Sequence, residues 1–365
     1  MKNILQTARK KAESLERINF DEALALYEEN DLLFLGKTAR KMKEFKSGKK
    51  IFYIINRHIN LTNICSSNCP LCAFQCRSGD NRGYTLELDD VEKILKSFRA
   101  VKNLSEIHVV SAIHPEKNFS YYLDVIKLIK KFFPNVSINA FTPAEIFNFA
   151  KTENKTFSEI LTTLKNFGVD TLPGGGAEIF SPRVREIICP KKLSGEEWLE
   201  IMETAHKIGM KTNASILYGH IETVEERIEH LIKIRELQDK TKNFQAMMLF
   251  PFFPKNTELG EKFNLRQIGA WENLKMLALS RIILDNFDHF KAFWVMLTLP
   301  VVQLALSFGA DDLDGTIGEE KIIHAAGAKG DSEISIETLN EIISEVGYIP
   351  TLRDSFYEEK NHENK

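Results

Sequence analysis

The chain has 365 residues, with 48 Lys and Arg against 51 Asp and Glu, so its formal net charge is −3. This near balance argues against a protein that binds nucleic acid or a membrane surface, because such binding depends on an excess of basic charge. Hydrophobic residues make up 43% of the chain and charged residues 27%, which excludes the disordered and fibrous classes. A chain of this length can bury a large core without disulfides.

The N-terminal segment is basic and polar and lacks the apolar core of a signal peptide. The longest nearly apolar run, residues 246–253, is too short to cross a bilayer. We therefore expect no membrane association, and the clustered free cysteines indicate a reducing, cytoplasmic compartment. Residues 1–50 predict helices that precede the main fold, with a helix start at Asn19 to Glu22.

From residue 51 onward, strand-like and helix-like segments alternate. Strands are expected at residues 51–61, 106–111, 136–141, 169–172, 212–217, 245–250 and 292–297. Apolar residues at spacings of three and four predict helices at residues 86–98, 119–133, 157–167, 195–208, 223–238 and 270–287. This alternation is typical of parallel βαβ units and predicts an α/β protein with a closed or nearly closed (β/α) barrel of the TIM type over residues 51–297. Residues 298–365 predict a C-terminal extension of helix, loop and helix that completes the barrel.

Four of the five cysteines lie close together, as Cys65, Cys69, Cys72 and Cys76. The first three are separated by three and two residues, so three thiolates can converge from one loop. Three thiolates suit an iron–sulfur cube with one iron left open. A structural zinc site, which requires four ligands, is the alternative, with Cys76 as the fourth. The loop lacks the two separated cysteine pairs usual at zinc sites, and this favours the iron–sulfur cluster.

The cysteine loop and the Phe74 that follows it resemble the signature of radical S-adenosylmethionine enzymes. Those enzymes are α/β barrels whose cluster loop follows the first strand, where the alternation also places these cysteines. The resemblance implies a [4Fe–4S] cluster held by Cys65, Cys69 and Cys72, with S-adenosylmethionine bound at the open iron and cleaved to a 5'-deoxyadenosyl radical. It also places Phe74 among the cofactor-binding residues.

Segments over about residues 56–357 resemble the radical S-adenosylmethionine enzymes of the futalosine route to menaquinone. Two branches, the aminofutalosine synthases and the dehypoxanthine futalosine cyclases, share the cysteine loop and a triple glycine. Residues 139–142, 180–185 and 188–190 favour the synthase branch. In that branch the radical would add to 3-[(1-carboxyvinyl)oxy]benzoate, an enolpyruvyl benzoate, and rearrangement with loss of carbon dioxide would give 6-amino-6-deoxyfutalosine. The resemblance also implies a flavodoxin or ferredoxin as electron donor.

In the first predicted strand, alternation places His58, Asn60 and Thr62 on one face. A polar row inside a barrel is costly unless it meets a ligand, water or an internal hydrogen-bond network. His58 is the candidate for substrate contact, and a satisfied internal network is the alternative. His220, after the fifth predicted strand, is either a proton carrier or a residue that caps its loop.

The two carboxylates of the implied substrate each need a cation or a cluster of donors. Arg57 is favoured because it stands at a strand end, and the alternative for any such arginine is an ordinary surface salt bridge. The other arginines near the motif segments are Arg183, Arg185 and Arg281.

A run of three glycines, Gly174, Gly175 and Gly176, follows the fourth predicted strand. Glycine lets the backbone pass close to a ligand. Together with Glu178, this run is expected to form a wall for the methionyl or ribose part of S-adenosylmethionine. Glu178, and Glu145 after the third predicted strand, are candidates to accept hydrogen bonds from the ribose hydroxyls.

Ser111 and Ala112 follow the second predicted strand, where the resemblance leads us to expect a pair of glycines. Backbone carbonyls at this point would hold the methionyl amino group, and any residue supplies a carbonyl, so Ser111 stays a cofactor-binding candidate. Cys76 lies in a loop that is longer than expected, and it is interpreted as a spare thiol, with a ligand or redox role as the alternative.

Overall fold

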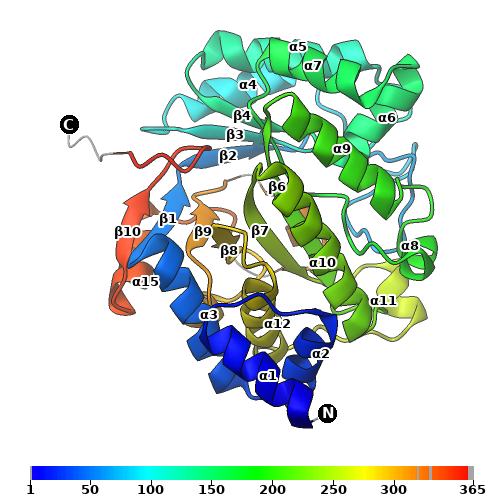
Figure 1. Cartoon of the computed structure of the whole chain (residues 1–365). Coiled ribbons are helices and arrows are strands. Elements are labelled where there is room, and N and C mark those ends of the chain that lie inside the picture. Colours follow the sequence, from blue (N-terminus) through cyan, green and yellow to red (C-terminus); the bar gives the residue numbers. More distant parts are fainter. Residues whose placement is uncertain (1, 319, 329–330, 361–365) are drawn as a thin grey trace.

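A curled parallel sheet forms the centre of the protein, and helices cover its outer face (Figure 1). The structure, a computed structural model, describes residues 2–318, 320–328 and 331–360. All pairings between neighbouring strands are parallel, which confirms the predicted α/β barrel of the TIM type. The strands are β1 (Lys50–Ile54), β2 (Asn56–Ile59), β3 (Glu106–Val109), β4 (Ser137–Ala140), β5 (Thr171–Leu172), β6 (Lys211–Tyr218), β7 (Phe244–Pro251), β8 (His289–Lys291), β9 (Asp312–Gly315) and β10 (Ile349–Leu352).

The first predicted strand is divided at Ile55 into β1 and β2. β1 pairs with β9 and β10, whereas β2 pairs with β3, so the two ends of the sheet meet along one continuous segment. The His58 amide donates to the Gly318 carbonyl across this meeting point, at 3.3 Å. The sheet is therefore a nearly closed barrel whose strands end on one side.

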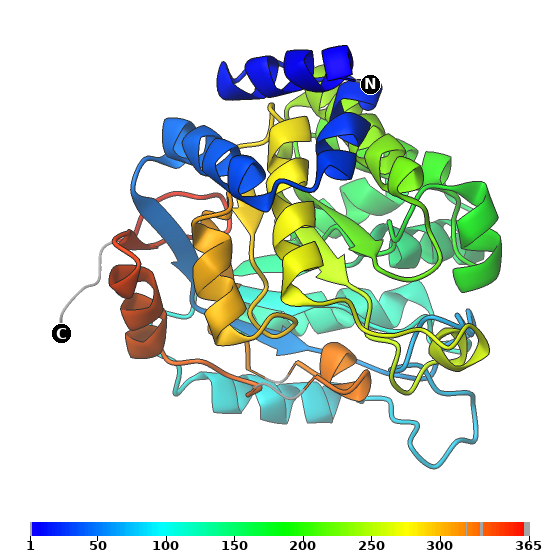
Figure 2. The same cartoon turned by 90° about the horizontal axis from the view of Figure 1, so that it is seen from below.

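The predicted N-terminal helices are confirmed, and α3 packs against α12 (Figure 2). A capping box starts α2: the Asn19 side chain accepts from the Glu22 amide at 2.9 Å, and the Glu22 carboxylate accepts from the Asn19 amide at 2.8 Å. The N-terminal and central helices are α1 (Lys2–Glu13), α2 (Phe20–Glu29), α3 (Leu32–Ser47), α4 (Leu88–Phe98), α5 (Phe119–Phe132), α6 (Pro143–Glu153), α7 (Phe157–Phe167), α8 (Pro182–Ile188), α9 (Gly195–Lys207), α10 (Val224–Thr241), α11 (Glu258–Lys262) and α12 (Ala270–Ile283). No helix in the described part of the chain is both long and apolar enough to cross a membrane.

Two expectations about the C-terminal third are wrong. The predicted strand at residues 292–297 is a loop, and β8 precedes it. Residues 298–365 contain two strands, β9 and β10, beside helices α13 (Leu299–Leu306), α14 (Ile322–Ala325) and α15 (Ile336–Glu345), instead of helix and loop alone. β9 was missed because its sequence, Asp-Leu-Asp-Gly, lacks β-branched and aromatic residues.

A substitution at Gly315 tests the closure of the barrel between β1 and β9. A Cβ atom at Gly315 would collide with the Ile54 carbonyl oxygen and with the Asn56 side chain, because β9 and β1 are in close contact there. We expect Gly315→Ala to lower the free energy of unfolding by about 1 to 3 kcal/mol or more. Chemical denaturation followed by circular dichroism measures it.

Gly269 supplies the control, because a Cβ atom there meets no atom within 4 Å. Gly269→Ala is expected to change the free energy of unfolding by less than about 1 kcal/mol. Equal effects of the two substitutions would contradict the tight β1–β9 contact.

Candidate active site

A cavity of about 1080 Å³, part of it open to solvent, lies where the strands end. Its wall takes residues from the carboxyl halves of most strands and from the loops that follow, as expected for a barrel of this kind. Much of this wall is apolar. The apolar residues are Leu71, Val110, Pro173, Leu217, Met248, Phe250, Phe293, Met296, Ile322 and Ile323.

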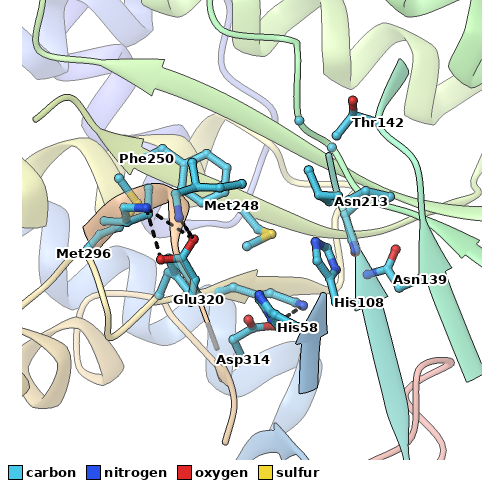
Figure 3. A pocket seen from close by; sticks show the side chains of 18 of the residues that line it. His58, His108, Asn139, Thr142, Asn213, Met248, Phe250, Met296, Asp314 and Glu320 are labelled. Atoms are coloured by element: carbon cyan, nitrogen blue, oxygen red, sulfur yellow. Dashed lines mark hydrogen bonds and ion pairs between the residues drawn. The ribbon is translucent and has the colours of Figure 1, made fainter. Parts of the chain in front are cut away.

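One part of the cavity, the polar end, is formed by His58, His108, Asn139, Lys291 and Asp314 (Figure 3). His58 on β2 stands opposite His108 on β3, which stands opposite Asn139 on β4. The two imidazole rings stack, with centroids 4.6 Å apart. The register of three neighbouring parallel strands therefore aligns three polar side chains in one row.

The charges at the polar end are fixed by burial and by one ion pair. Lys291 Nζ lies 2.6 Å from Asp314 Oδ1, and both side chains are buried. Burial is the largest influence and would raise the pKa of Asp314, but the charge and hydrogen bond of Lys291, together with the charge of Arg353, lower that pKa to about 2. Burial, reinforced by His108, lowers the pKa of His58 to about 3, so His58 is neutral at pH 7.

Several buried polar atoms around the cavity have no hydrogen-bond partner among the described residues. They include His58 Nε2, Asn139 Oδ1 and Asn213 Oδ1, all on residues that line the cavity. A buried polar atom without a partner costs free energy, which a bound ligand or water can recover. These atoms fit a polar ligand better than the self-satisfied internal network considered for His58.

The cysteine loop borders the same cavity, because Leu71 between Cys69 and Cys72 contributes to its wall. The Ser66 amide donates to the Ile113 carbonyl at 2.9 Å and ties the loop to the segment after β3. Burial raises the pKa of Cys69 to about 12, against the charge of a nearby lysine, and the Cys72 thiol adds to the rise. Among the described residues, no group of three His, Cys, Asp or Glu side chains is close enough to hold a single metal ion.

Cys76 has different neighbours from the other three cysteines of the loop. Its thiol accepts a hydrogen bond from Asn63 Nδ2 at 3.3 Å, and the charged groups near it are Arg82 and Asp80. Its backbone pairs with Asn63 and Cys65, so its position is fixed by the loop itself. The geometry therefore supports the spare-thiol interpretation and gives no fourth ligand for the alternative zinc site.

The glycine run is required by close packing. A Cβ atom at Gly174 would lie 2.7 Å from the Ala214 carbonyl carbon, and one at Gly175 would lie 2.8 Å from the Thr142 methyl group. Gly176 has φ +85°, which disfavours other residues. Gly174 and Gly175 line the cavity, so their backbone is exposed to a ligand there.

Glu178 lines the cavity beside the glycine run and forms an ion pair with Lys192, at 2.7 Å. Burial is the largest influence and opposes ionisation of this carboxyl, but the charge and hydrogen bond of Lys192, together with the charge of Arg185, lower its pKa. Lys192 and Cys69 also interact electrostatically, which places the Glu178 pair next to the cysteine loop. A ligand that extends from the cysteine loop into the cavity would therefore contact Glu178.

Glu145 has a different environment from Glu178. Its carboxylate accepts from the Ser111 amide at 2.9 Å and from the Thr142 amide and hydroxyl, each at 2.8 Å. Burial raises the pKa of Glu145 to about 7 against these hydrogen bonds. Glu145 does not line the cavity, so in this structure it orders the backbone at Ser111 and at the start of α6. The Ser111 hydroxyl is buried without a partner among the described residues.

The structure does not bring Arg57 to the cavity. Its guanidinium donates to the Asn56 carbonyl at 2.9 Å and to the Thr316 hydroxyl at 3.0 Å, and it forms an ion pair with Glu333. Alternation along β2 puts Arg57 on the face opposite to His58. Its side chain therefore points away from the cavity although Arg57 stands at a strand end. The lysine that does reach the cavity, Lys291, was missed, although it is the one charged residue in the run 290–297.

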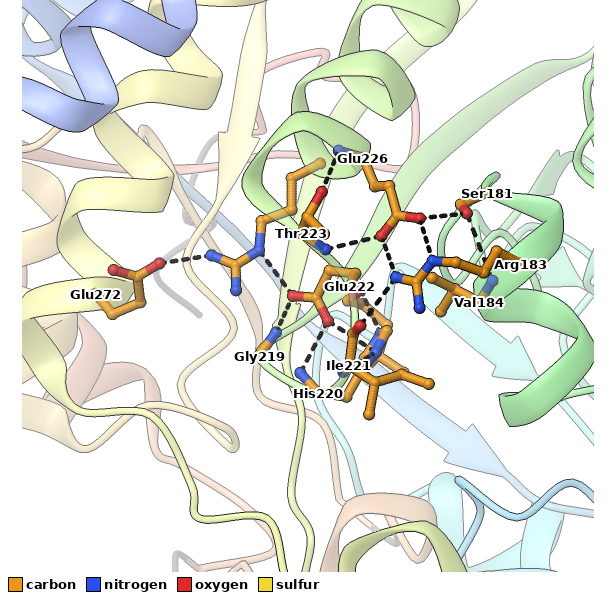
Figure 4. A network of polar contacts seen from close by, with 12 residues as sticks. Ser181, Arg183, Val184, Gly219, His220, Ile221, Glu222, Thr223, Glu226 and Glu272 are labelled. Carbon is orange, nitrogen blue, oxygen red and sulfur yellow. Dashed lines mark hydrogen bonds and ion pairs between the residues drawn. The ribbon is translucent and has the colours of Figure 1, made fainter. Parts of the chain in front are cut away.

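His220 lies in a buried polar network with Glu222 (Figure 4). Its Nδ1 is 2.7 Å from the Glu222 carboxylate, which also binds Arg227 at 2.7 Å, and Arg227 reaches Glu272 at 2.5 Å. Burial would raise the pKa of Glu222, but the hydrogen bond from His220 and the nearby cations lower it to about 2. His220 does not line the cavity, so the geometry supports the loop-capping alternative.

Phe74 is buried next to the cysteine loop, with its ring edge-on to Tyr84 at 6.3 Å between centroids.

Sequence reasoning also missed His108, Glu106 and Glu320 at the cavity wall. His108 had a usable signal, because it lies inside the predicted strand 106–111 in phase with Glu106 and Val110.

Comparison with known proteins agrees with this geometry. Residues 59–234 match the radical SAM superfamily, and residues 241–365 match the CofH/MqnC C-terminal region. Two solved structures share the fold at TM-score 0.73: methylornithine synthase (PylB), at 15% identity over 94% of this chain and 97% of that one, and the FeFe-hydrogenase maturase HydG from Carboxydothermus hydrogenoformans, at 18% identity over 98% and 81%.

Curated relatives are similar over nearly the whole chain. An aminodeoxyfutalosine synthase of Thermus thermophilus is 40% identical over 94% of this chain and 92% of its own length, and one of Streptomyces coelicolor is 37% identical over 95% and 92%. A 5-amino-6-(D-ribitylamino)uracil–L-tyrosine 4-hydroxyphenyl transferase of Methanosarcina barkeri is 37% identical over 88% and 86%. The chain therefore belongs to the CofH/MqnC family of radical SAM enzymes, and its reaction is of the transferase type.

Proposed function

We propose that the protein is an aminodeoxyfutalosine synthase of menaquinone biosynthesis. It would transfer the 5'-deoxyadenosyl group of S-adenosylmethionine to 3-[(1-carboxyvinyl)oxy]benzoate, with rearrangement and loss of carbon dioxide, to give 6-amino-6-deoxyfutalosine. The observation that carries the proposal is one cavity that joins an exposed glycine backbone beside the cysteine loop to an apolar space ending in a buried lysine. The 40% identity to a named synthase supports the choice of substrate.

The radical SAM family implies a [4Fe–4S] cluster and S-adenosylmethionine, and Cys65, Cys69 and Cys72 are consistent with cluster ligands. When bound, the cluster and S-adenosylmethionine supply a 5'-deoxyadenosyl radical. In this chain Gly174 and Gly175 would pass close to the nucleoside, and Glu178 would accept from its ribose hydroxyls.

The remaining wall would hold the acceptor and keep water out. Phe250, Phe293 and Met248 provide flat and flexible apolar surface for a benzoate ring. An apolar wall also removes water and stray hydrogen donors from a reactive carbon radical. We expect a flavodoxin or ferredoxin in a reducing compartment to supply the electron.

A second candidate is the tyrosine-dependent transferase activity named for other relatives. One observation favours it: the described cavity wall carries more carboxylates than cations, so an amino acid ammonium group would find an acidic partner there. The carboxylates are Glu106, Glu178, Asp314 and Glu320, against Lys291. Product analysis separates the two candidates.

The cysteines provide the first test of this proposal. Cys69→Ala is expected to lose most of its iron and the brown absorption of the cluster, because three thiolates are the minimum set for the cube. Cys76→Ser is the matched control, since its thiol is bound to Asn63 instead, and it should keep wild-type iron and sulfide. Metal analysis after anaerobic reconstitution measures both. Bound zinc, lost on changing Cys76, would contradict the cluster and support a zinc-binding module.

The activity itself provides the second test. Reconstituted protein with a strong reductant, S-adenosylmethionine and the enolpyruvyl benzoate is expected to form a closed-shell product whose mass equals 5'-deoxyadenosyl plus acceptor minus carbon dioxide and one hydrogen atom, which leaves as a proton and an electron. Mass spectrometry detects it, and Cys69→Ala should abolish it. Parallel reactions contain L-tyrosine with 5-amino-6-(D-ribitylamino)uracil, and dehypoxanthine futalosine. Turnover of either of these, with the benzoate untouched, would overturn the synthase assignment in favour of the transferase or the cyclase.

A further inference from the structure

The polar end of the cavity holds a single cation. Lys291 stands at the end of β8 with only 6% of its side chain exposed, and it is the one Lys or Arg among the described residues that line the cavity. A buried ammonium group is costly unless it is paired, and Asp314 provides that pair. Ion pairing explains how Lys291 is tolerated, but it does not explain why it faces a ligand cavity.

Lys291 keeps donor capacity after it has bound Asp314. An ammonium group has three N–H donors, and Asp314 Oδ1, at 2.6 Å, is its one hydrogen-bond partner among the described residues. His58 faces the same space and leaves its Nε2 without a partner (Figure 3). An oxygen-rich group entering the polar end would therefore meet the unused N–H donors of Lys291.

The sheet order separates Lys291 from the glycine run. The glycine run follows β5, whereas Lys291 ends β8, and β6 and β7 lie between them. In the proposed reaction the alkene must lie next to the nucleoside, beside the glycine run. With the alkene at the glycine run, the ring carboxylate would lie away from that run, on the side where Lys291 lines the cavity.

We propose that Lys291 binds the ring carboxylate of the acceptor and that Asp314 is the positioning residue that holds Lys291 toward the cavity. Asp314 is suited to this role because its backbone is constrained at φ +64° on β9, so its carboxylate has a fixed direction. This inference rests on the proposed function for the identity of the acid. It assigns the polar end to an aromatic carboxylate rather than to an amino acid ammonium group.

Binding of two probes of the same shape, one charged and one uncharged, tests the assignment without turnover. Cluster-reconstituted protein is titrated with 3-hydroxybenzoate and with 3-hydroxybenzamide by calorimetry. Wild-type protein should bind the benzoate more tightly, and Lys291→Gln should weaken benzoate binding by about tenfold or more, while benzamide binding changes by less than about threefold. With the full substrate, Lys291→Gln should raise KM more than it lowers kcat.

Two further variants separate charge from structure. Asp314→Asn keeps a hydrogen-bond acceptor for Lys291 but removes the paired charge, so it should weaken benzoate binding by less than Lys291→Gln does. Lys43→Gln is the matched control, because Lys43 is a buried lysine on α3 that donates to the Gly48 carbonyl outside the cavity. It should leave the binding of both probes unchanged.

Lys291→Gln leaves Asp314 unpaired and can fail to fold for that reason. In that case the double variant Lys291→Gln with Asp314→Asn replaces it and should show the same loss of benzoate binding.

Three results would overturn the assignment: no preference of the wild-type protein for benzoate, an equal loss for both probes in Lys291→Gln, or an equal loss of benzoate binding in Lys291→Gln and Asp314→Asn. Failure of the proposed function looks different. If the enolpyruvyl benzoate is not converted but benzoate binding still depends on Lys291, the carboxylate site stands and the reaction assignment falls. If the enolpyruvyl benzoate is converted and its KM is unchanged in Lys291→Gln, the reaction assignment stands and the carboxylate site falls.

Discussion

The site depends on one constraint: the continuous segment 50–59 contributes a strand to each of the two sides of the sheet that meet when the barrel closes. β1 joins β9 and β10, and β2 joins β3, with only Ile55 between them. Because all strands are parallel and the curl is nearly closed, the loops at their carboxyl ends converge on one cavity. The cysteine loop follows β2 directly, so closure also places the thiols beside that cavity. A slip of one residue in this segment would turn His58 outward.

The closure uses charged residues where most barrels use apolar ones. β9 and the residue before it carry three aspartates in four positions, each paired with a basic side chain from outside β9. A buried ion pair seldom adds net stability, but removal of one partner costs about 3 to 5 kcal/mol. Such pairs therefore fix geometry more than they stabilise the fold. The pairs are Asp311 with His289 at 2.9 Å, Asp312 with Arg353 at 2.6 Å and Asp314 with Lys291 at 2.6 Å.

Local patterns in the sequence were sufficient for the barrel and the cysteine loop, because hydrophobic periodicity and cysteine spacing are short-range signals. They were insufficient for β9, whose aspartates pair with basic side chains far away in the chain. Lys291 was missed for the same reason: Asp314 lies 23 residues later, and the apolar run after Lys291 resembled a strand more strongly than β8 does. For Arg57, alternation along the strand was the better guide, since it puts the guanidinium on the face away from the cavity.

The central claim is that cofactor and acceptor meet in one cavity, with the nucleoside at the glycine run and the ring carboxylate at the polar end. A crystal structure of the anaerobic holoenzyme with S-adenosylmethionine and the enolpyruvyl benzoate tests it most directly. We expect the C5' atom at about 3 to 4 Å from the alkene carbon and the ring carboxylate on Lys291 Nζ. An acceptor bound outside the cavity, or reversed so that its ring carboxylate lies at Gly174, would contradict it.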